Sequence, residues 1–255
     1  MTPGYVEFEF DLPEALLARL IKTLNKMSGA SLAPANLVGI PEVQGVYQLL
    51  LDNDLIYIGK TDAKAGLRKR LERHSRKIQM RRGLDPARVT FKAVRIYVFT
   101  AIDLEKQLLK NYGGTPVVRW NGSGFGSNDP GKKRDRTTYK KNHFDIVFPI
   151  DIDLPLSFSL VSEKSASDIL NSLKDALPFL LRFEQIETKP KTPHFDLSRT
   201  AIVFETERLW TARTLIEHIV AQLPAGWQAI KLPSHMILYK EDQAYPQGEV
   251  IARSR

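Results

Sequence analysis

The 255-residue sequence contains no cysteine, which excludes disulfide bonds and zinc sites built on cysteine ligands. No run approaches eighteen apolar residues, so no membrane span is predicted. The first residues, MTPGYVEFEFDLPEALL, carry acidic side chains early and lack a basic segment followed by an apolar core, so we expect no signal peptide and a cytoplasmic location. An internal repeat, a P-loop, a dinucleotide-binding glycine motif and an HExxH motif are also missing.

Acidic residues are scarce in one long part of the chain. Between Lys60 and Lys141 there are 22 Lys and Arg against 7 Asp and Glu, a net charge of +15. Because the whole chain carries +8, the remainder carries −7. A solvated charged surface does not explain such segregation, whereas a polyanionic partner does, because neutralising phosphates releases counterions and supplies sequence-independent affinity. We therefore expect a nucleic acid as the partner.

Two short segments rich in Val, Ile, Leu and Tyr, residues 45–51 and 55–59, predict a β-hairpin around the polar turn Asp52-Asn53-Asp54. Side chains alternate faces along a strand, so a loop of odd length places Tyr47 and Tyr57 on the same face, whereas a two-residue loop would separate them. Gly59 ends the second strand, where a missing side chain allows close backbone approach. An ordinary hairpin with two half-buried tyrosines is the alternative interpretation.

Apolar residues at helical spacing predict an amphipathic helix from Gly66 to about Arg82: Leu67, Leu71 and Ile78. Arg70 and His74 are four residues apart and therefore share one face beside this apolar stripe. We expect a third strand at 89–99, apolar on both sides in its second half, as in a buried strand.

Thr100 is predicted to cap the next helix, with Asp103 helping to satisfy its first amides. Glu105 falls within the apolar stripe of this helix, which consists of Ala101, Leu108, Leu109 and Tyr112. A carboxylate on an apolar face is costly unless it is paired or binds a cation. From the helix alone, an interior ion pair with an arginine and a metal site both remain open.

The order of these segments carries a family resemblance. GVY, then YIGK with its tyrosine ten positions after the first, then LRKRLERH, resembles the signature of the GIY-YIG nuclease superfamily, with Val46 in place of the usual isoleucine. The resemblance implies an α+β fold whose core is a small antiparallel three-stranded sheet flanked by helices. It also implies a metal-dependent phosphodiesterase site built from Tyr47, Tyr57, Arg70 and a glutamate on the helix after the third strand, here Glu105.

A second stretch, WNGSGFGSNDPG, is similar to the restriction-endonuclease branch of that superfamily, in which an asparagine completes the active site; the resemblance assigns that role to Asn121. The glycines exclude a packed strand or helix. Such a loop allows backbone amides to approach phosphate, although flexibility alone explains it equally well. Basic residues before and after this loop are the expected DNA contacts: Lys60, Lys69, Arg73, Arg76, Lys132, Lys133, Arg134 and Arg136.

Each expected site residue has a chemical role. By the proposal usual for the superfamily, Tyr47 is the base toward water, and His74 is placed to relay its proton. We expect nearby cations to favour the Tyr47 phenolate. Arg70 offers planar donors to the developing phosphate charge. Tyr57 orients the phosphate, and Asn121 holds it or the substrate backbone. One divalent ion on Glu105, Mg²⁺ or alternatively Mn²⁺, is implied, since only one carboxylate falls in place.

We expect three regions. Residues 1–40 form a leader with a strand in residues 1–12 and a helix, followed by a loop; residues 41–149 form the catalytic domain; and residues 150–255 form an α/β extension for dimerisation or DNA recognition. This extension has 12 Lys and Arg against 14 Asp and Glu, so it lacks bulk DNA-binding charge. It is predicted to contain helices at 165–177 and 211–223, a strand at 200–205, and a hairpin of residues 227–232 and 236–240.

The predicted function is that of a type II restriction endonuclease that cuts double-stranded DNA, as a homodimer on a palindromic site. The alternatives are a structure-specific repair or mobile-element nuclease on the same scaffold, and a non-catalytic nucleic-acid-binding module. The four remaining histidines have no partners at catalytic or ligand spacing and are interpreted as structural or exposed: His143, His194, His218 and His235.

Overall fold

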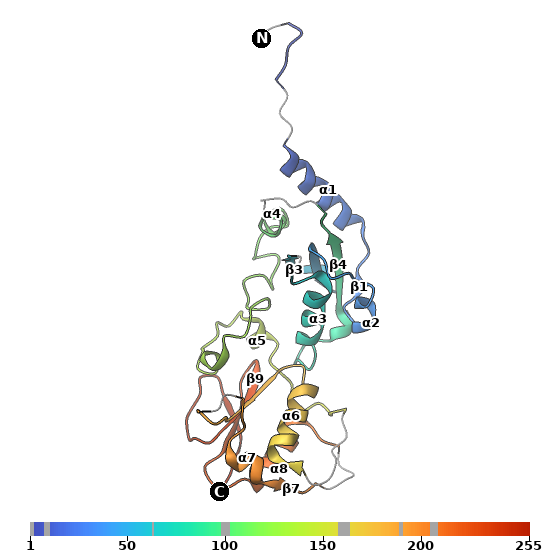
Figure 1. Ribbon diagram of the computed structural model, residues 1–255. Coiled ribbons are helices and arrows are strands. Elements are labelled where there is room, and N and C mark those ends of the chain that lie inside the picture. Colours follow the sequence, from blue (N-terminus) through green and yellow to red (C-terminus); the bar gives the residue numbers. More distant parts are fainter. Residues whose placement is uncertain are drawn as a thin grey trace. The chain divides into compact units, whose positions relative to one another are not determined.

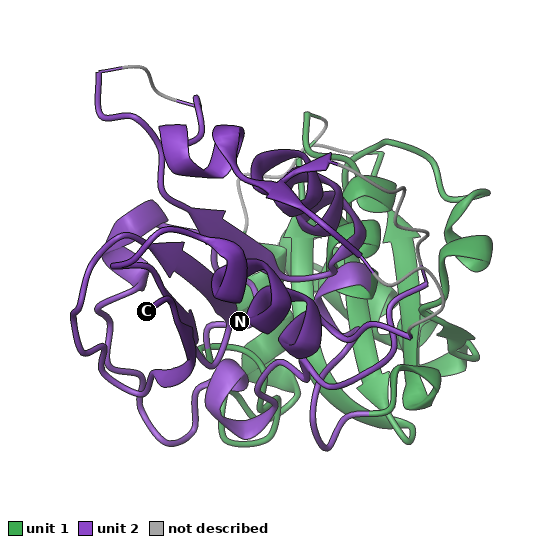
Figure 2. Ribbon diagram, turned by 90° about the horizontal axis from the view of Figure 1, so that it is seen from below, with its two compact units in different colours: residues 1–75, 85–123 green, residues 76–84, 124–255 purple. Residues whose placement is uncertain are grey.

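The computed structural model shows a mixed α/β protein and describes residues 3–7, 11–62, 64–97, 103–157, 164–188, 191–204 and 209–255 (Figure 1). The chain divides into two compact units (Figure 2). The first unit consists of residues 1–75 and 85–123, and the second of residues 76–84 and 124–255. In the described part of the chain, no helix has both the length and the apolar character needed to cross a membrane.

The first unit contains a sheet of four strands in the order β1-β4-β2-β3, with all neighbours antiparallel. The sheet therefore has one strand more than the three that were expected. The additional strand forms because two residues of the predicted loop before the hairpin pair with β4. The elements of this unit are α1 (Leu12–Lys26), β1 (Ala30–Ser31), α2 (Pro34–Leu37), β2 (Gly45–Leu51), β3 (Asp54–Thr61), α3 (Leu67–Lys77), the 3₁₀ helix η1 (Pro86–Arg88), β4 (Val89–Arg95) and α4 (Leu104–Asn111).

The β2–β3 hairpin differs from the predicted one in its loop. The loop has two residues, Asp52 and Asn53, both in the left-handed region with φ of 53° and 71°, as a tight hairpin turn requires. A two-residue loop alone would place the two tyrosines on opposite faces. A bulge restores them to one face, because Leu50 pairs with Leu55 but Leu49 pairs with Tyr57, which leaves one extra residue in β3.

The two faces of this sheet are covered by different helices. Val46 and Ile58 point to the face where α1 and α4 contribute Leu24 and Leu108, and all four side chains are buried. The opposite face carries Tyr47 and packs against α3. The hairpin thus buries an apolar face against two helices and holds its tyrosines against a third.

Several element ends differ from those predicted. Helix α3 stops at Lys77 instead of about Arg82, and β4 ends at Arg95 instead of residue 99. The cap of α4 is Asp103, whose carboxylate accepts the backbone N–H of Lys106 at 3.4 Å. The predicted cap Thr100 lies outside the described residues. Residues 3–7 form no strand, and the rest of the strand expected in residues 1–12 includes residues 8–10, which are likewise outside the described part.

The second unit contains a sheet in the order β10-β8-β9-β6, in which β6 and β9 are parallel and the other pairs antiparallel. Helix α8 packs against β8 and β10, and α6 packs against β6. The elements of the second unit are the 3₁₀ helix η2 (Gly131–Arg134), α5 (Phe144–Val147), β5 (Lys164–Ser165), α6 (Ala166–Ala176), β6 (Leu180–Phe183), α7 (Phe195–Arg199), β7 (Ala201–Ile202), α8 (Ala212–Gln222), β8 (Gln228–Lys231), β9 (His235–Tyr239) and β10 (Glu249–Arg253).

The predicted helices at 165–177 and 211–223 and the predicted hairpin at 227–240 are confirmed as α6, α8 and β8–β9. The strand expected at 200–205 is shorter, since β7 covers only Ala201–Ile202. The division into regions also differs. The leader helix packs into the first unit, and residues 124–149, expected in the catalytic domain, belong to the second unit. Sequence composition gave no sign of this, because the basic stretch runs across the boundary.

A buried carboxylate lies between two arginines in the second unit. Asp145 is fully buried and accepts hydrogen bonds from Arg81 and Arg134, both at 2.8 Å. Burial alone would raise the pKa of Asp145, but the arginines and Lys77 hold it below its ordinary value. Removing one partner of a buried pair leaves an uncompensated charge, which costs about 3–5 kcal/mol.

We therefore expect Asp145→Asn to lower the free energy of unfolding by several kcal/mol, measured by urea titration. Because the folded-state pKa is depressed, the carboxylate stabilises the fold above a pH of about 4. That stabilisation is lost as the pH falls from there through the folded pKa. Asp153→Asn, at a 40 % exposed side chain paired with Arg82 and Arg213, is the matched control and should cost less than about 1 kcal/mol. Equal losses from both variants would contradict this assignment.

Candidate functional site

Two tyrosines and a histidine meet on the α3 face of the hairpin in the first unit. The Tyr47 hydroxyl and His74 Nε2 share a hydrogen bond of 2.8 Å. The Tyr47 and Tyr57 rings are 6.1 Å apart, and each lies within 5.6 Å of the His74 imidazole, measured between ring centroids. All three side chains are buried. The predicted shared face of the tyrosines and the predicted approach of His74 are thus both confirmed.

Arg70 completes this group from the same helix. Its Nε–H donates to the Tyr47 hydroxyl oxygen at 3.3 Å, one helical turn before His74. Its guanidinium also interacts with the Tyr57 hydroxyl. The helix periodicity explains the arrangement, because residues four apart project from the same side of α3.

The electrostatics of Tyr47 differ from the expectation that nearby cations favour its phenolate. Burial raises the pKa of Tyr47, and Tyr57 adds to the rise, while Arg70 opposes it without cancelling it. Burial likewise raises the pKa of Tyr57, where the charge of Glu105 contributes in the same direction. Tyr47 therefore rests as a neutral phenol whose proton can move only if a neighbour accepts it.

Two glycines make room for this site. Tyr47 pairs with Gly59 across the hairpin, and a Cβ at Gly59 would collide with the Tyr47 ring and hydroxyl. At Gly45 a Cβ would meet Leu67 of α3 and the backbone oxygen of Val94. Gly59 thus leaves space for the Tyr47 side chain, and Gly45 allows α3 to lie close to the sheet.

Glu105 lies in the first turn of α4 and is half-buried. Burial raises the pKa of its carboxyl group, whereas the charges of Lys60 and Arg70 and the backbone amide of Lys60 act in the opposite direction. No ion pair of Glu105 exists among the described residues, so the interior ion pair that was the alternative interpretation is not formed there. The carboxylate is close enough to Arg70 and Tyr57 to influence both electrostatically.

Glu105 is the candidate protein ligand for one magnesium-like cation. Within the described residues, no group of three or more His, Cys, Asp or Glu side chains could hold a metal ion. Mg²⁺ does not require such a group, because it usually keeps several waters and binds one or two carboxylates together with substrate phosphates. Glu105 is half-buried and forms no ion pair within the described residues, so it is the residue that would hold the ion.

Lys60, an expected DNA contact, is bound to the cap of α4. Its Nζ lies 2.8 Å from Asp103 Oδ1, and both side chains are about half exposed. Exposed pairs of this kind contribute little to stability and exchange partners at low cost. The half-exposed Lys60 side chain therefore remains accessible to an anionic ligand.

Asn121 does not point at the tyrosine hydroxyls; its amide pairs with a strand edge. Its Oδ1 accepts the backbone N–H of Ile58 and its Nδ2 donates to the Ile58 carbonyl, both at 2.9 Å. The backbone N–H of Trp120 donates to the carbonyl of Ile56 at 2.8 Å. Together they cover the outer edge of β3, which no strand pairs within the described sheet. In this arrangement Asn121 fixes the residue between Tyr57 and Gly59.

The remaining expected DNA contacts fall into exposed and internal groups. Lys69 is 67 % exposed and pairs weakly with Glu42 at 3.6 Å, and Arg73 is half-buried on α3. Lys132 and Lys133 in η2 are exposed. These lysines keep the character expected of phosphate contacts.

Arg76, Arg134 and Arg136 are used within the second unit. Arg76 donates to the carbonyl of Leu177 at 2.6 Å, beyond the last turn of α6. Arg134, with a side chain only 13 % exposed, binds Asp145 and Tyr139, and Arg136 donates to Gln243 at 2.5 Å. Arg134 in particular is a structural residue here, and the sequence cannot reveal this because its carboxylate partner lies eleven residues away in the chain.

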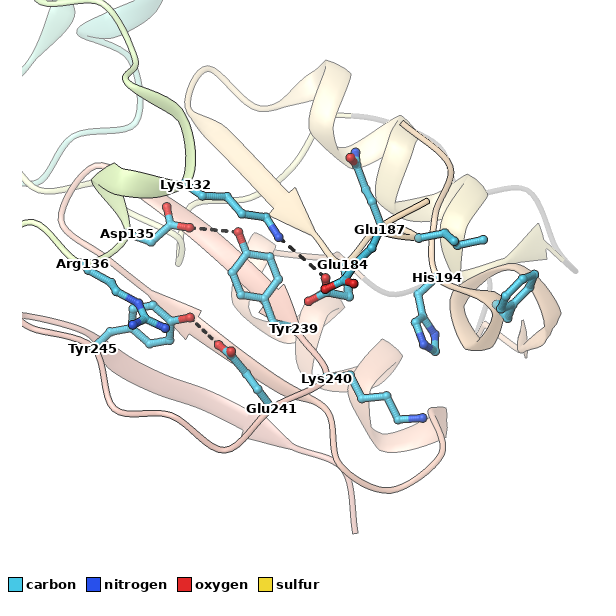
Figure 3. Close-up of a pocket in the computed structure, with 13 residues that line it drawn as sticks. Lys132, Asp135, Arg136, Glu184, Glu187, His194, Tyr239, Lys240, Glu241 and Tyr245 are labelled. Carbon is cyan, nitrogen blue, oxygen red and sulfur yellow. Dashed lines mark hydrogen bonds and ion pairs between the residues drawn. The ribbon is translucent and has the colours of Figure 1, made fainter. Parts of the chain in front are cut away.

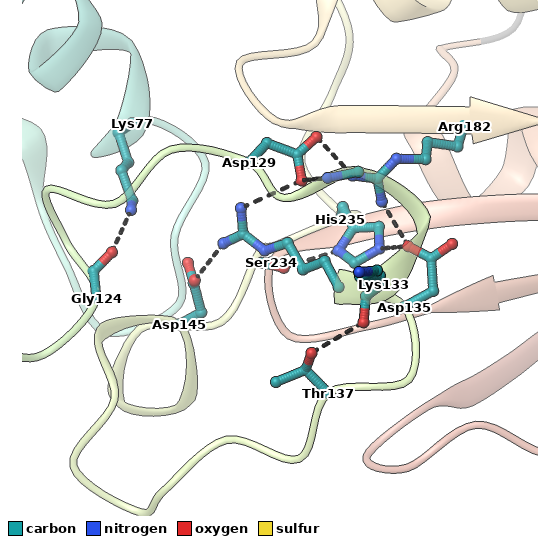
Figure 4. Close-up of polar contacts among 12 residues, drawn as sticks. Lys77, Gly124, Asp129, Lys133, Asp135, Thr137, Asp145, Arg182, Ser234 and His235 are labelled. Carbon is teal, nitrogen blue, oxygen red and sulfur yellow. Dashed lines mark hydrogen bonds and ion pairs between the residues drawn. The ribbon is translucent and has the colours of Figure 1, made fainter.

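The second unit contains a buried hydrogen-bond network that was not predicted from the sequence (Figure 4). Asp135 accepts from Arg182 at 2.5 Å and lies 2.7 Å from His235 Nε2, and His235 Nδ1 lies 2.7 Å from the Ser234 hydroxyl. The order resembles a Ser-His-Asp triad, but the Asp135 carboxylate is also held by Arg182 and Tyr239, so the set forms part of a larger network that connects segments of this unit. The network joins the loop after η2 to β6 and β9, so His235 is structural, as predicted.

The first part of the glycine-rich stretch is packed, whereas residues 127–130 are exposed. Phe125 is fully buried against Phe144, and Lys77 Nζ donates to the carbonyls of Gly124 and Phe125 at 3.1 and 2.7 Å. At Gly124, with φ of 83°, a Cβ would collide with the His143 ring.

In comparisons with known proteins, no family model and no curated sequence matched the chain.

Proposed function

We propose that this protein is an endonuclease of the GIY-YIG type that hydrolyses phosphodiester bonds of double-stranded DNA with one divalent ion, Mg²⁺ or Mn²⁺. Within that type we propose a type II restriction endonuclease that acts in the cytoplasm as a homodimer on a palindromic site. The observation that carries the proposal is the contact of one buried hydroxyl, that of Tyr47, with both His74 and Arg70. The resemblance of the hairpin and α3 segments to that superfamily supports it.

The Tyr47 hydroxyl can pass a proton from water to His74. The Tyr47 O–H donates to His74 Nε2 when the histidine is in the tautomer in which Nε2 is the acceptor. One lone pair of the Tyr47 oxygen accepts the Arg70 N–H, and the other can accept an O–H of water. Because the raised pKa of Tyr47 disfavours a standing phenolate, the water proton reaches the tyrosine oxygen as the tyrosine proton moves to the imidazole. Imidazole is suited to this because it changes charge near neutral pH.

Arg70 and Tyr57 face the phosphate in this mechanism. The Arg70 Nε–H donates to Tyr47, so the terminal nitrogens of the guanidinium are the donors left for the phosphate oxygens. A planar guanidinium matches two phosphate oxygens at once. Bound at Glu105, a divalent ion would neutralise the phosphate and stabilise the leaving oxygen. Asn121 acts by holding β3, and therefore Tyr57, in place.

The direct test is incubation of the purified protein with a supercoiled plasmid in Mg²⁺, in Mn²⁺ and in excess EDTA. We expect linear or fragmented DNA with either metal and none in EDTA, and sequencing of the ends should show one short palindrome. Ends at junctions or flaps instead of a fixed sequence would favour the structure-specific repair or mobile-element nuclease. Metal-independent DNA binding without any cleavage would leave only the non-catalytic binding module.

We expect the exposed lysines of the basic stretch to control the affinity of the protein for duplex DNA. The variant Lys69→Gln with Lys133→Gln removes two exposed charges and should weaken binding to all duplex sequences alike, because phosphate contacts carry no base information. The slope of log affinity against log salt should become shallower by roughly one for each lysine that no longer neutralises a phosphate. Filter binding or fluorescence anisotropy at several salt concentrations measures this.

The control for this charge experiment is Lys22→Gln with Lys26→Gln, two exposed lysines of α1 outside the basic stretch. It removes the same charge but should leave the salt slope unchanged. A loss restricted to one DNA sequence in the Lys69 and Lys133 variant would instead identify base reading at these positions.

A further inference from the structure

The second unit contains a cavity of about 570 Å³ far along the sequence from the tyrosine site (Figure 3). Its walls come from the η2 loop, the segment after β6, the start of α7 and the end of β9. This volume lies in the range of small-molecule sites in proteins.

The exposed charges around the cavity are balanced. Three cations line it, Lys132, Arg136 and Lys240, and three carboxylates, Glu184, Glu187 and Glu241. The fourth lining carboxylate, Asp135, has a side chain only 3 % exposed and is already bound to Arg182, His235 and Tyr239. A polyanion would meet as many negative as positive groups here, so the lining suits a neutral ligand with both hydrogen-bond donors and acceptors.

An exposed aromatic ring lies at the edge of this cavity. The sequence His-Phe-Asp occurs twice, at 143–145 and 194–196, and each histidine Nδ1 accepts the aspartate N–H at 3.2 Å at the start of a short helix. The two phenylalanines nevertheless differ. Phe144 is buried, whereas Phe195 is 54 % exposed and lines the cavity. The same local structure thus offers its ring to the solvent only where the cavity lies.

We propose that this cavity binds a single nucleobase that lies outside a base stack. A base is a neutral planar ring whose edge carries both donors and acceptors, which matches the balanced lining groups, and its face can stack on Phe195. Lys132 pairs with Glu184 at 3.7 Å and Lys240 with Asp196 at 2.8 Å, and Glu241 accepts from the Tyr245 hydroxyl. Pairs of partly exposed groups contribute little to stability, so a base can replace these partners. The lysines can then donate to ring nitrogens and carbonyls, and the glutamates can accept from exocyclic amines. In taking DNA as one source of the base, the inference rests on the proposed function; a free nucleoside is the other source.

Two probes distinguish these sources, both used with the full chain in EDTA so that cleavage plays no part. The first is a DNA hairpin with one bulged 2-aminopurine, whose fluorescence reports the environment of an extrahelical base whatever the recognition sequence. The second is each of the four free nucleosides, measured by calorimetry. Response to the bulge alone indicates a base presented by DNA, and response to a nucleoside alone indicates a free ligand.

The variants are Phe195→Ala and Glu241→Gln, with Tyr5→Ala as a control at another exposed aromatic residue. Stacking on one aromatic ring is worth a factor of about 5 to 150 in affinity, so Phe195→Ala should weaken the responding probe at least about fivefold. Tyr5→Ala should leave it unchanged. Circular dichroism verifies folding. We expect all three variants to fold, because Phe195 and Tyr5 are exposed and glutamine keeps the size of Glu241.

Two results would overturn the nucleobase site: neither probe binds the wild-type protein, or both cavity variants bind as tightly as wild type. Plasmid cleavage by the same protein batch keeps this inference separate from the proposed function. A protein that cuts DNA but is indifferent to the cavity variants contradicts only the nucleobase site. A protein that binds a base but never cuts contradicts only the nuclease.

Discussion

Glu105→Gln is expected to abolish plasmid cleavage in Mg²⁺ while duplex binding in EDTA stays at the wild-type level or improves. The amide keeps the size of the side chain but cannot supply the negative oxygen that a hard divalent cation prefers. Glu105 forms no ion pair in the described chain. The change to glutamine therefore leaves no buried cation without its ion-pair partner. The measurements are a single-turnover cleavage assay and fluorescence anisotropy.

Glu72→Gln provides the control for this experiment, since Glu72 is an exposed carboxylate in the same unit, on α3. It removes the same charge and should cut at close to the wild-type rate. The metal assignment is wrong if Glu105→Gln cleaves DNA in magnesium as fast as the unmodified protein.

Tyr47→Phe is expected to reduce single-turnover cleavage by roughly 10² or more, the scale typical of losing a general base. The ring and its contacts with Tyr57 and His74 remain, so folding should survive, but the oxygen that links Arg70 to His74 is gone. Tyr112→Phe is the control, because it also removes a hydroxyl hydrogen bond in the first unit, that to Asn25. It should leave the rate unchanged.

The pH dependence identifies which group holds the proton. Because burial raises the pKa of Tyr47, no increase in rate from tyrosine ionisation is expected near neutrality. The defect of His74→Ala should be milder at high pH than at neutral pH, because hydroxide can replace the relay. An equal defect at every pH would remove His74 from the proton path.

Arg70→Lys separates a phosphate clamp from a simple positive charge. An ammonium cannot copy a planar fork that holds Tyr47 with one nitrogen and phosphate with the others, so the defect should approach that of Tyr47→Phe at all pH values. Recovery of most of the activity in the lysine variant would show that charge alone suffices.

The strands of the hairpin could be predicted from the sequence, but the geometry of its turn could not. Its strands follow from β-branched and aromatic residues, and the shared face of Tyr47 and Tyr57 was predicted. The predicted cause, a three-residue loop, was wrong. The two-residue turn and the bulge beside Leu49 produce the same result, because each shifts the side-chain alternation by one residue. A bulge depends on cross-strand pairing and has no local sequence signal.

Arginines show a different limit. Arg70 and Arg134 look alike in a basic segment, yet one contacts Tyr47 while the other is held inside the second unit by Asp145. Asn121 was expected to complete a site, and its amide instead holds the edge of β3. In each case the deciding partner lies at a distance that the sequence does not specify.

By itself, the sequence determined the absence of disulfides, the segregated charge, most helices and strands, and the helical spacing that puts Arg70 and His74 on one face. These are consequences of composition and of fixed local periods, 3.6 residues in helices and two in strands. Only the tertiary structure decided the fourth strand of the first sheet, the reassignment of residues 124–149 to the second unit, and the raised pKa of Tyr47. Those depend on burial and on interactions between segments far apart in the chain, because desolvation and pairing act through space.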